Sequence, residues 1–192
     1  MQSYRRLLIA FIALILSSWA LYQHFQPAPT QPAAPTQPAA QNTPLALFET
    51  KFKTLENQEL SLKQWHGKII VLNFWAPWCP PCRDEMPELS HLQDQYKAQN
   101  VVVIGLAAED VEKTQAYFKE DKSHAVSYPI LIGDLDAMDL SEKLGNSRGI
   151  LPYTVVIDAN GNVVKTFLGR INQPLIEKSL LPLLNHSDTD AP

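Results

Sequence analysis

The sequence contains little of what metal-binding and nucleic-acid-binding proteins need. Only two cysteines occur among 192 residues, and the five histidines have no ligand spacing. A four-ligand zinc site is therefore excluded, and no metal site is expected. The formal net charge is -4, and no basic run interleaved with aromatic residues occurs. A nucleic-acid partner is therefore not expected.

Charged residues are missing from a long N-terminal stretch. Residues 7–25 contain no Asp, Glu, Lys or Arg, whereas Arg5 and Arg6 precede them. The run is marginally long enough to span a bilayer and no clear cleavage signal follows it. Residues 1–26 are therefore predicted to be a retained signal anchor in the inner membrane, with a cleaved signal and a soluble periplasmic protein as the alternative. The positive-inside rule exports the rest of the chain to a compartment that permits disulfides.

The next stretch has little to bury and many prolines. Residues 27–44 contain the unit Pro-Thr-Gln-Pro-Ala-Ala twice in succession. Proline at this density blocks helix and sheet, so an extended linker is predicted. Residues 45–184 then provide one domain, and residues 185–192 a polar tail.

The two cysteines lie together in the segment Trp78-Cys79-Pro80-Pro81-Cys82. Two thiols separated by two residues can close into a disulfide and reopen without moving the rest of the fold. A purely structural disulfide is the alternative, but so short a loop constrains the unfolded chain little. We therefore predict a redox-active Cys79–Cys82 disulfide that works without a further cofactor.

Hydrophobic patterning predicts alternating strands and helices. Apolar runs at residues 69–72 and 101–106 are typical of strands buried on both faces, and the amphipathic pattern between them predicts a helix over 80–100. This alternation predicts an α/β fold with a mixed central sheet. The other expected elements are a hairpin over 48–62, helices at 111–121, 137–144 and 173–184, a strand at 128–132, and strands at 153–157 and 162–167 joined by an Asn-Gly turn.

The segment from Phe74 to Cys82 resembles the active site of the thioredoxin superfamily. The residues after it, Arg83 to Pro87, and the helix-strand-helix insertion that follows are similar to the TlpA/ResA branch. Members of this branch are membrane-anchored thiol-disulfide oxidoreductases of the bacterial cell envelope. Over residues 45–184 the resemblance implies a thioredoxin-like fold with an N-terminal hairpin and a central insertion. It further implies a monomer that exchanges disulfides with proteins and is re-reduced by a membrane electron donor.

The nucleophile follows from the position of the cysteines. If the helix begins near Pro80, then Cys79 lies at its N-terminus, where unpaired backbone N–H groups and the helix dipole favour a thiolate. Cys82 lies one turn further in, so it is predicted to be more enclosed and to resolve the mixed disulfide.

The proton acceptor for this resolution step is not obvious from the sequence. Thioredoxins have a buried acid at the position of Asn73, and asparagine cannot take up the proton. In the ResA-like branch an acid after the next strand serves instead, which indicates Glu109 and Asp110, with Asp110 preferred. The alternative interpretation makes these two residues a solvated turn and a helix cap.

The resemblance also indicates substrate-binding residues. Pro152 is predicted to be a cis proline opposite the cysteines, with Leu151 before it offering backbone hydrogen bonds to an extended substrate. Trp78, with Pro80 and Pro81 beside it, is predicted to shield the sulfurs and meet the partner protein.

The sequence is compatible with three functions. The preferred one is a reductant of protein disulfides, for example of apocytochrome c or copper-site cysteines. A thiol peroxidase is disfavoured because the residues around Cys79 lack the peroxidase pattern. A Cu(I) carrier is disfavoured because no methionine or histidine reinforces the two thiolates.

Overall fold

The structure is a computed structural model that describes residues 44–187. The predicted signal anchor, residues 1–26, and all but the last residue of the predicted linker lie outside these residues. Across 44–187, no helix has both the length and the apolar character needed to cross a membrane.

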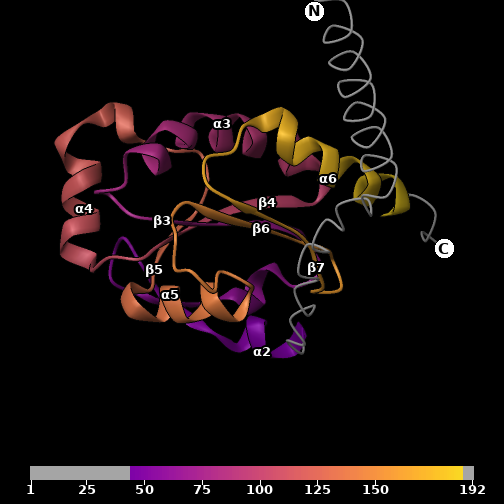
Figure 1. Cartoon of the computed structure of the whole chain (residues 1–192), viewed down its shortest axis with the longest axis horizontal. Helices are drawn as coiled ribbons and strands as arrows, with labels where there is room; N and C mark the ends of the chain where they lie inside the picture. The colour runs from indigo at the N-terminus through magenta and orange to yellow at the C-terminus, as the bar shows by residue number, and fades with distance from the viewer. Residues whose placement is uncertain (1–43, 188–192) are drawn as a thin grey trace, which may run out of the picture. The chain divides into compact units, whose positions relative to one another are not determined.

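A seven-stranded mixed sheet forms the centre of the domain (Figure 1). The strand order is β2-β1-β5-β4-β3-β6-β7. Strands β3, β4 and β5 pair in parallel, and all other neighbours pair antiparallel. The predicted mixed sheet is therefore confirmed. The strands are β1 (Lys51–Thr54), β2 (Glu59–Ser61), β3 (Ile69–Trp75), β4 (Val101–Ala107), β5 (Ile130–Ile132), β6 (Tyr153–Ile157) and β7 (Val163–Leu168).

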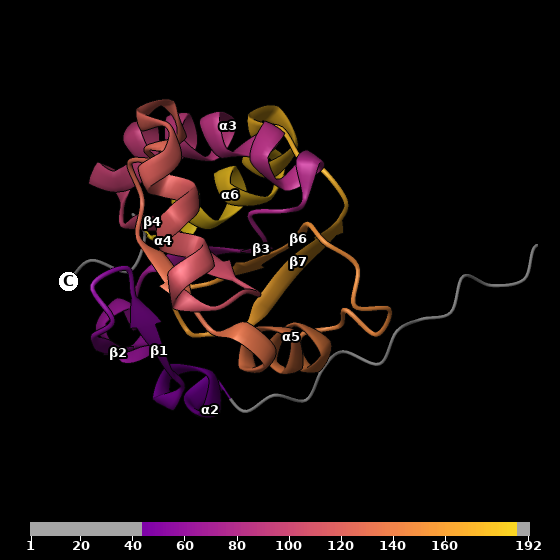
Figure 2. The same cartoon turned by 90° about the vertical axis from the view of Figure 1, so that its left-hand side faces the viewer.

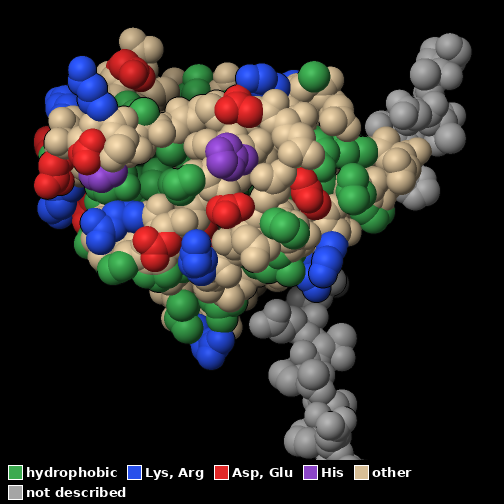
Figure 3. Space-filling model, turned by 90° about the horizontal axis from the view of Figure 1, so that it is seen from above, with side chains coloured by type: hydrophobic (Ala, Val, Ile, Leu, Met, Phe, Trp, Pro, Cys, Tyr) green, Lys and Arg blue, Asp and Glu red, His purple; other side chains and the backbone are tan. Residues whose placement is uncertain are grey.

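Helices cover both faces of this sheet (Figures 1 and 2). One face carries α3 (Pro80–Tyr96), α4 (Val111–Glu120) and α6 (Gln173–Ser187), and the other carries α2 (Pro44–Glu49) and α5 (Asp134–Lys143). Short 3-10 turns lie at Leu62–Trp65, Lys97–Gln99 and Lys122–His124. Seen from above, the surface over α3 and α6 mixes acidic and basic side chains without a basic patch (Figure 3).

The residues of the central strand β3 explain why helices pack on both faces of the sheet. All seven of its residues are buried. Side chains alternate across a strand, so Val71 and Trp75 pack with α3 whereas Leu72 and Phe74 pack with α5. By the same alternation Asn73 points to the α3 face, beneath the helix that carries the cysteines.

Several predicted boundaries shift in the structure. Helix α2 was not predicted, and it begins at Pro44, the last residue assigned to the linker. Six residues are too few to show a helical period. Helix α6 continues to Ser187, three residues into the predicted polar tail. Helix α3 ends at Tyr96, and the chain turns at Asn100, which has a left-handed φ of 61°.

Two leucines provide a test of this packing. Leu89 on α3 is 0% exposed and Leu181 on α6 is 49% exposed. Replacing Leu89 with alanine should lower the free energy of unfolding by about 2–5 kcal/mol, because the cavity lies in the core. The matched change Leu181→Ala should cost less than about 1 kcal/mol. Urea denaturation measures both, and equal losses would contradict this assignment of the core.

Candidate active site

Helix α3 begins directly after the first cysteine. Cys79 is the N-cap residue, with extended backbone (φ -94°, ψ 102°), and Pro80 occupies the first helical position. Proline suits this position because its missing N–H would have no helical partner there. The N-terminal position predicted for Cys79 is therefore confirmed. Unpaired N–H groups and the helix dipole favour a thiolate at that position.

Cys79 and Cys82 form a disulfide, and both residues are buried. Cys79 is 4% exposed and Cys82 is 0% exposed, so Cys82 is the more enclosed cysteine, as predicted. Trp78 next to them is 64% exposed, and Pro80 and Pro81 are exposed as well. These three residues form an accessible rim beside the disulfide.

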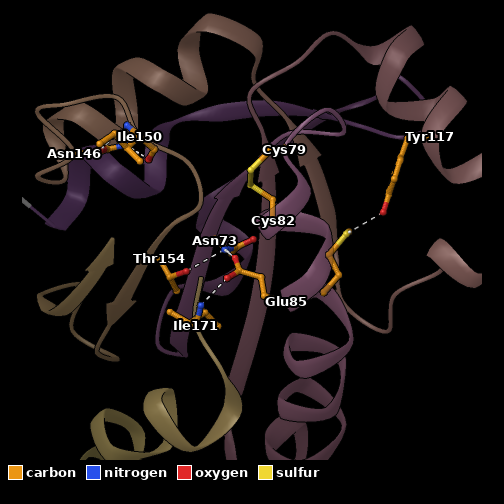
Figure 4. The surroundings of a disulfide bond; sticks show 10 residues. Asn73, Cys79, Cys82, Glu85, Tyr117, Asn146, Ile150, Thr154 and Ile171 are labelled. Carbon is orange, nitrogen blue, oxygen red and sulfur yellow. Dashed lines mark hydrogen bonds between the residues drawn. A yellow bond between two sulfur atoms is a disulfide. The ribbon is translucent and has the colours of Figure 1, made fainter. Parts of the chain in front are cut away.

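A buried polar network lies beneath the disulfide (Figure 4). The Asn73 Nδ2 group donates to Glu85 Oε1 at 2.7 Å and to Thr154 Oγ1 at 3.0 Å. The other carboxylate oxygen of Glu85 accepts from the backbone N–H of Ile171 at 2.8 Å. All three polar side chains are 0% exposed. The network therefore joins β3, α3, β6 and the segment before α6.

Burial changes the acidity of this carboxyl group. Desolvation raises the pKa of Glu85 to about 7, although hydrogen bonds from Ile171 and Asn73 and the charge of Arg170 act in the opposite direction. Glu85 follows Cys82 by three residues on α3, and residues at this spacing lie on the same face of a helix. A carboxyl that gains or loses its proton near neutral pH thus lies one turn from the resolving cysteine.

Sequence reasoning missed Glu85. One feature of the sequence could have indicated its role. Glu85 lies on the helix face that also carries Met86, Leu89 and Leu92, which are all buried. A carboxyl on such a face needs partners, because an unpaired buried charge is costly. The partner Ile171 lies 86 residues away in the sequence.

The amide of Asn73 has one unused group. Its Oδ1 atom is buried and has no hydrogen-bond partner. Figure 4 shows this side chain directly below Cys82, between the disulfide and Glu85. A disulfide sulfur carries no proton, whereas a reduced Cys82 has an S–H group that can donate to such an oxygen.

The two acids predicted from the sequence lie at the end of β4, as expected, but they have different partners. Asp110 is the N-cap of α4, where its Oδ1 accepts from the Lys113 N–H at 2.8 Å, and this bond lowers its pKa. Glu109 accepts from Trp78 Nε1 at 3.1 Å and from Lys113 Nζ at 2.9 Å. Asp110 thus caps helix α4, as the alternative interpretation predicted. Glu109 instead contacts Trp78, one of the exposed residues beside the disulfide. Their role as bases stays a prediction.

The segment opposite the cysteines contains the expected proline. The Leu151–Pro152 peptide bond is cis, as predicted. Pro152 is buried, and the half-buried Leu151 packs against the apolar cluster that contains both cysteines. Trp75, the last residue of β3, is 1% exposed and packs on Tyr117, so its role is structural.

The buried carboxyl predicts a pH-dependent stability. The folded-state pKa of Glu85, about 7, lies above the ordinary value of 4.5 for a glutamate. The contribution of this carboxyl to stability is therefore complete below about pH 4.5 and is lost as the pH rises through about 7. The free energy of unfolding should fall over this window by on the order of 3 kcal/mol. Glu85→Gln should flatten the profile, whereas the control Glu112→Gln on the surface of α4 should not. An unchanged profile in Glu85→Gln would contradict the raised pKa.

Comparisons with known proteins agree with this geometry. The redoxin family profile matches residues 36–181. The thiol-disulfide oxidoreductase ResA of Halalkalibacterium halodurans is 33% identical over 126 residues, which are 65% of this chain and 67% of the relative. The protein of the same name from Bacillus cereus is 34% identical over 125 residues, which are 64% of this chain and 68% of the relative.

Solved structures show the same fold. A thiol:disulfide interchange protein from Chlorobium tepidum superposes with a TM-score of 0.60 at 25% identity, covering 70% of this chain and 92% of the other. A secreted thiol-disulfide isomerase from Corynebacterium glutamicum gives a TM-score of 0.62 at 22% identity, covering 72% and 85%. The chain therefore belongs to the redoxin family within the thioredoxin superfamily, as a ResA-like thiol-disulfide oxidoreductase.

Proposed function

We propose that the chain reduces disulfides of partner proteins outside the cytoplasm, using Cys79 as nucleophile and Cys82 as resolving thiol. The observation that carries this proposal is the disulfide at the N-terminus of α3 with Cys79 as N-cap. The two prolines between the cysteines support the reducing direction, because the dipeptide lacks the histidine found in strongly oxidising relatives.

The exchange moves two electrons from the protein to its partner. The Cys79 thiolate attacks one sulfur of the partner disulfide, the S–S bond breaks, and the other partner sulfur leaves as a thiolate that takes up a proton. Cys82 then loses its proton and attacks Cys79 Sγ, which forms the Cys79–Cys82 disulfide and expels the second partner thiolate. The protein is oxidised and the partner disulfide is reduced to two thiols.

Glu85 is the group whose surroundings best suit it to accept the Cys82 proton. It lies one helical turn from Cys82, and its pKa near 7 matches the working range of a general base. The alternatives are Asp110 and Glu109, the acids expected from the sequence. Asp110 accepts from the Lys113 N–H, which lowers its pKa, and Glu109 is already engaged by Lys113 Nζ and Trp78 Nε1.

The partners and location are part of the same proposal. Candidate substrates are cysteine pairs of apocytochrome c or of a copper-site protein, and a membrane electron donor restores the dithiol. The uncharged residues 7–25 support a single-pass anchor with the domain in the periplasm or an equivalent extracytoplasmic space. The names of the relatives support the exchange chemistry.

The assignment of the nucleophile can be tested by trapping. Cys82→Ser should accumulate a mixed disulfide between Cys79 and partner proteins, because no thiol remains to resolve it. Cys79→Ser is the matched control and should trap nothing. Non-reducing gels of membrane and periplasmic fractions measure the adducts and identify the partners. Adducts formed by Cys79→Ser instead would reverse the assignment.

The proton acceptor can be identified by single-turnover kinetics. Glu85→Gln should slow resolution of the mixed disulfide near neutral pH by about 10²–10⁴-fold, and the loss should shrink at higher pH, where Cys82 ionises unaided. Initial attack by Cys79 should change little. Asp110→Asn and Glu109→Gln, measured in the same assay, represent the competing assignment. Slow resolution in these two variants with a native rate in Glu85→Gln would give them the role.

A further inference from the structure

The side-chain amide of Asn73 is held in one orientation by its neighbours. Both hydrogens of Nδ2 are used, one in the bond to Glu85 Oε1 at 2.7 Å and the other in the bond to Thr154 Oγ1 at 3.0 Å. An ionised carboxylate can only accept hydrogen bonds, so the nitrogen of the amide has to face Glu85. The oxygen then has to face away from Glu85, and Figure 4 shows it on the side of Cys82.

This oxygen has no partner in the disulfide form. Two buried side-chain polar atoms are unpaired within residues 44–187, namely Asn73 Oδ1 and Trp75 Nε1. The indole nitrogen can only donate, so Oδ1 is the one unpaired buried acceptor among the described side chains. Unpaired buried polar groups are rare in folded proteins. One that lies beside a redox centre points to a partner that exists in the other redox state.

Cys82 gains the matching donor when the disulfide is reduced. Reduction breaks the S–S bond, takes up two electrons and two protons, and leaves an S–H group on Cys82. This residue is 0% exposed and belongs to the apolar cluster that contains Met86 and Leu89. An S–H group is a weak donor, but in such surroundings the nearby unpaired oxygen is a better partner than none.

We propose that Asn73 Oδ1 accepts a hydrogen bond from the Cys82 thiol in the reduced protein and thereby stabilises the dithiol relative to the disulfide. This inference rests on the proposed function, in which Cys82 is the resolving thiol. The bond exists only in the reduced form, because a disulfide sulfur has no hydrogen to donate. Asn73 therefore raises the reduction potential of the Cys79–Cys82 couple.

The same bond keeps the two cysteines in separate roles. A hydrogen bond made by the neutral thiol disfavours its ionised form, so the negative charge of the reduced site stays on Cys79 at the N-terminus of α3. An asparagine suits this position because its oxygen accepts the hydrogen bond without taking up the proton. The proton of Cys82 is then left for Glu85 to accept.

The S–H stretching vibration tests the bond directly, because its frequency falls when the thiol donates a hydrogen bond. In full-length Cys79→Ser, Cys82 is the one remaining cysteine of the chain, so the band has a single source. Its frequency should be low in the folded protein and should rise when urea unfolds it. Adding Asn73→Leu, or Asn73→Ala if the leucine variant does not fold, should raise the frequency in the folded protein.

Two matched variants separate the oxygen of Asn73 from the rest of the network. Asn73→Asp keeps an oxygen in the position of Oδ1, and Thr154→Val removes one anchor of the amide but leaves Oδ1 in place. Both should keep the low frequency. A frequency that does not change on unfolding would overturn the proposal. So would a low frequency that persists in Asn73→Leu, since Cys82 would then donate elsewhere, for example to the Trp78 carbonyl four residues earlier.

The redox equilibrium with glutathione measures the consequence in the protein with both cysteines. Asn73→Leu or Asn73→Ala should raise the equilibrium constant for disulfide formation about tenfold, which lowers the reduction potential by about 30 mV. Thr154→Val affects both redox forms alike, so its constant should stay native. An unchanged constant in the Asn73 variants would overturn the stabilising role. A native protein that does not exchange with glutathione at all would instead overturn the proposed function.

Discussion

The hydrogen bond from the Asn73 amide to the Glu85 carboxylate joins the strand before the disulfide to the helix after it. Both side chains are fully buried, so the bond is shielded from water and breaking it would leave a costly unpaired group. Since Glu85 also binds the Ile171 N–H, one carboxyl group holds the position of α3 relative to β3 and to the chain entering α6. The position of α3 in turn determines where Cys79 and Cys82 lie.

The same carboxyl links packing to redox chemistry. Its hydrogen bonds fix the first turns of α3, and its burial moves its pKa into the neutral range. A carboxyl with a low pKa would be fully ionised at neutral pH and would hold its hydrogen-bond donors more tightly, but it would be a weaker base. A carboxyl with a pKa far above 7 would already be protonated at neutral pH and could not accept a proton from Cys82. Both the stability of the fold and proton transfer at the disulfide therefore depend on the Glu85 carboxyl. A substitution that shifts its pKa to favour one of these properties also changes the other.

Local patterns predicted most of the fold because they depend on neighbouring residues. The apolar run of β3, the Asn-Gly turn before β7 and the proline after Cys79 each act within a few residues. The role of Glu85 was not predicted, because it depends on a partner brought close by the fold: Ile171 lies 86 residues away in the sequence. Glu109 and Asp110 were found in the expected place, and the cap at Asp110 was one of the two interpretations, yet the contact between Glu109 and Trp78 could not be read from the sequence.

The near-complete burial of Cys79 restricts which partner disulfides it can reach. The attacking sulfur must lie in line with the partner S–S bond that breaks, and here Cys79 is only 4% exposed. A disulfide embedded in a folded partner cannot come up to such a recessed sulfur, whereas one in an unfolded stretch can. The enzyme would thus distinguish proteins by their state of folding, and partners that have completed folding around a cofactor would be protected from it.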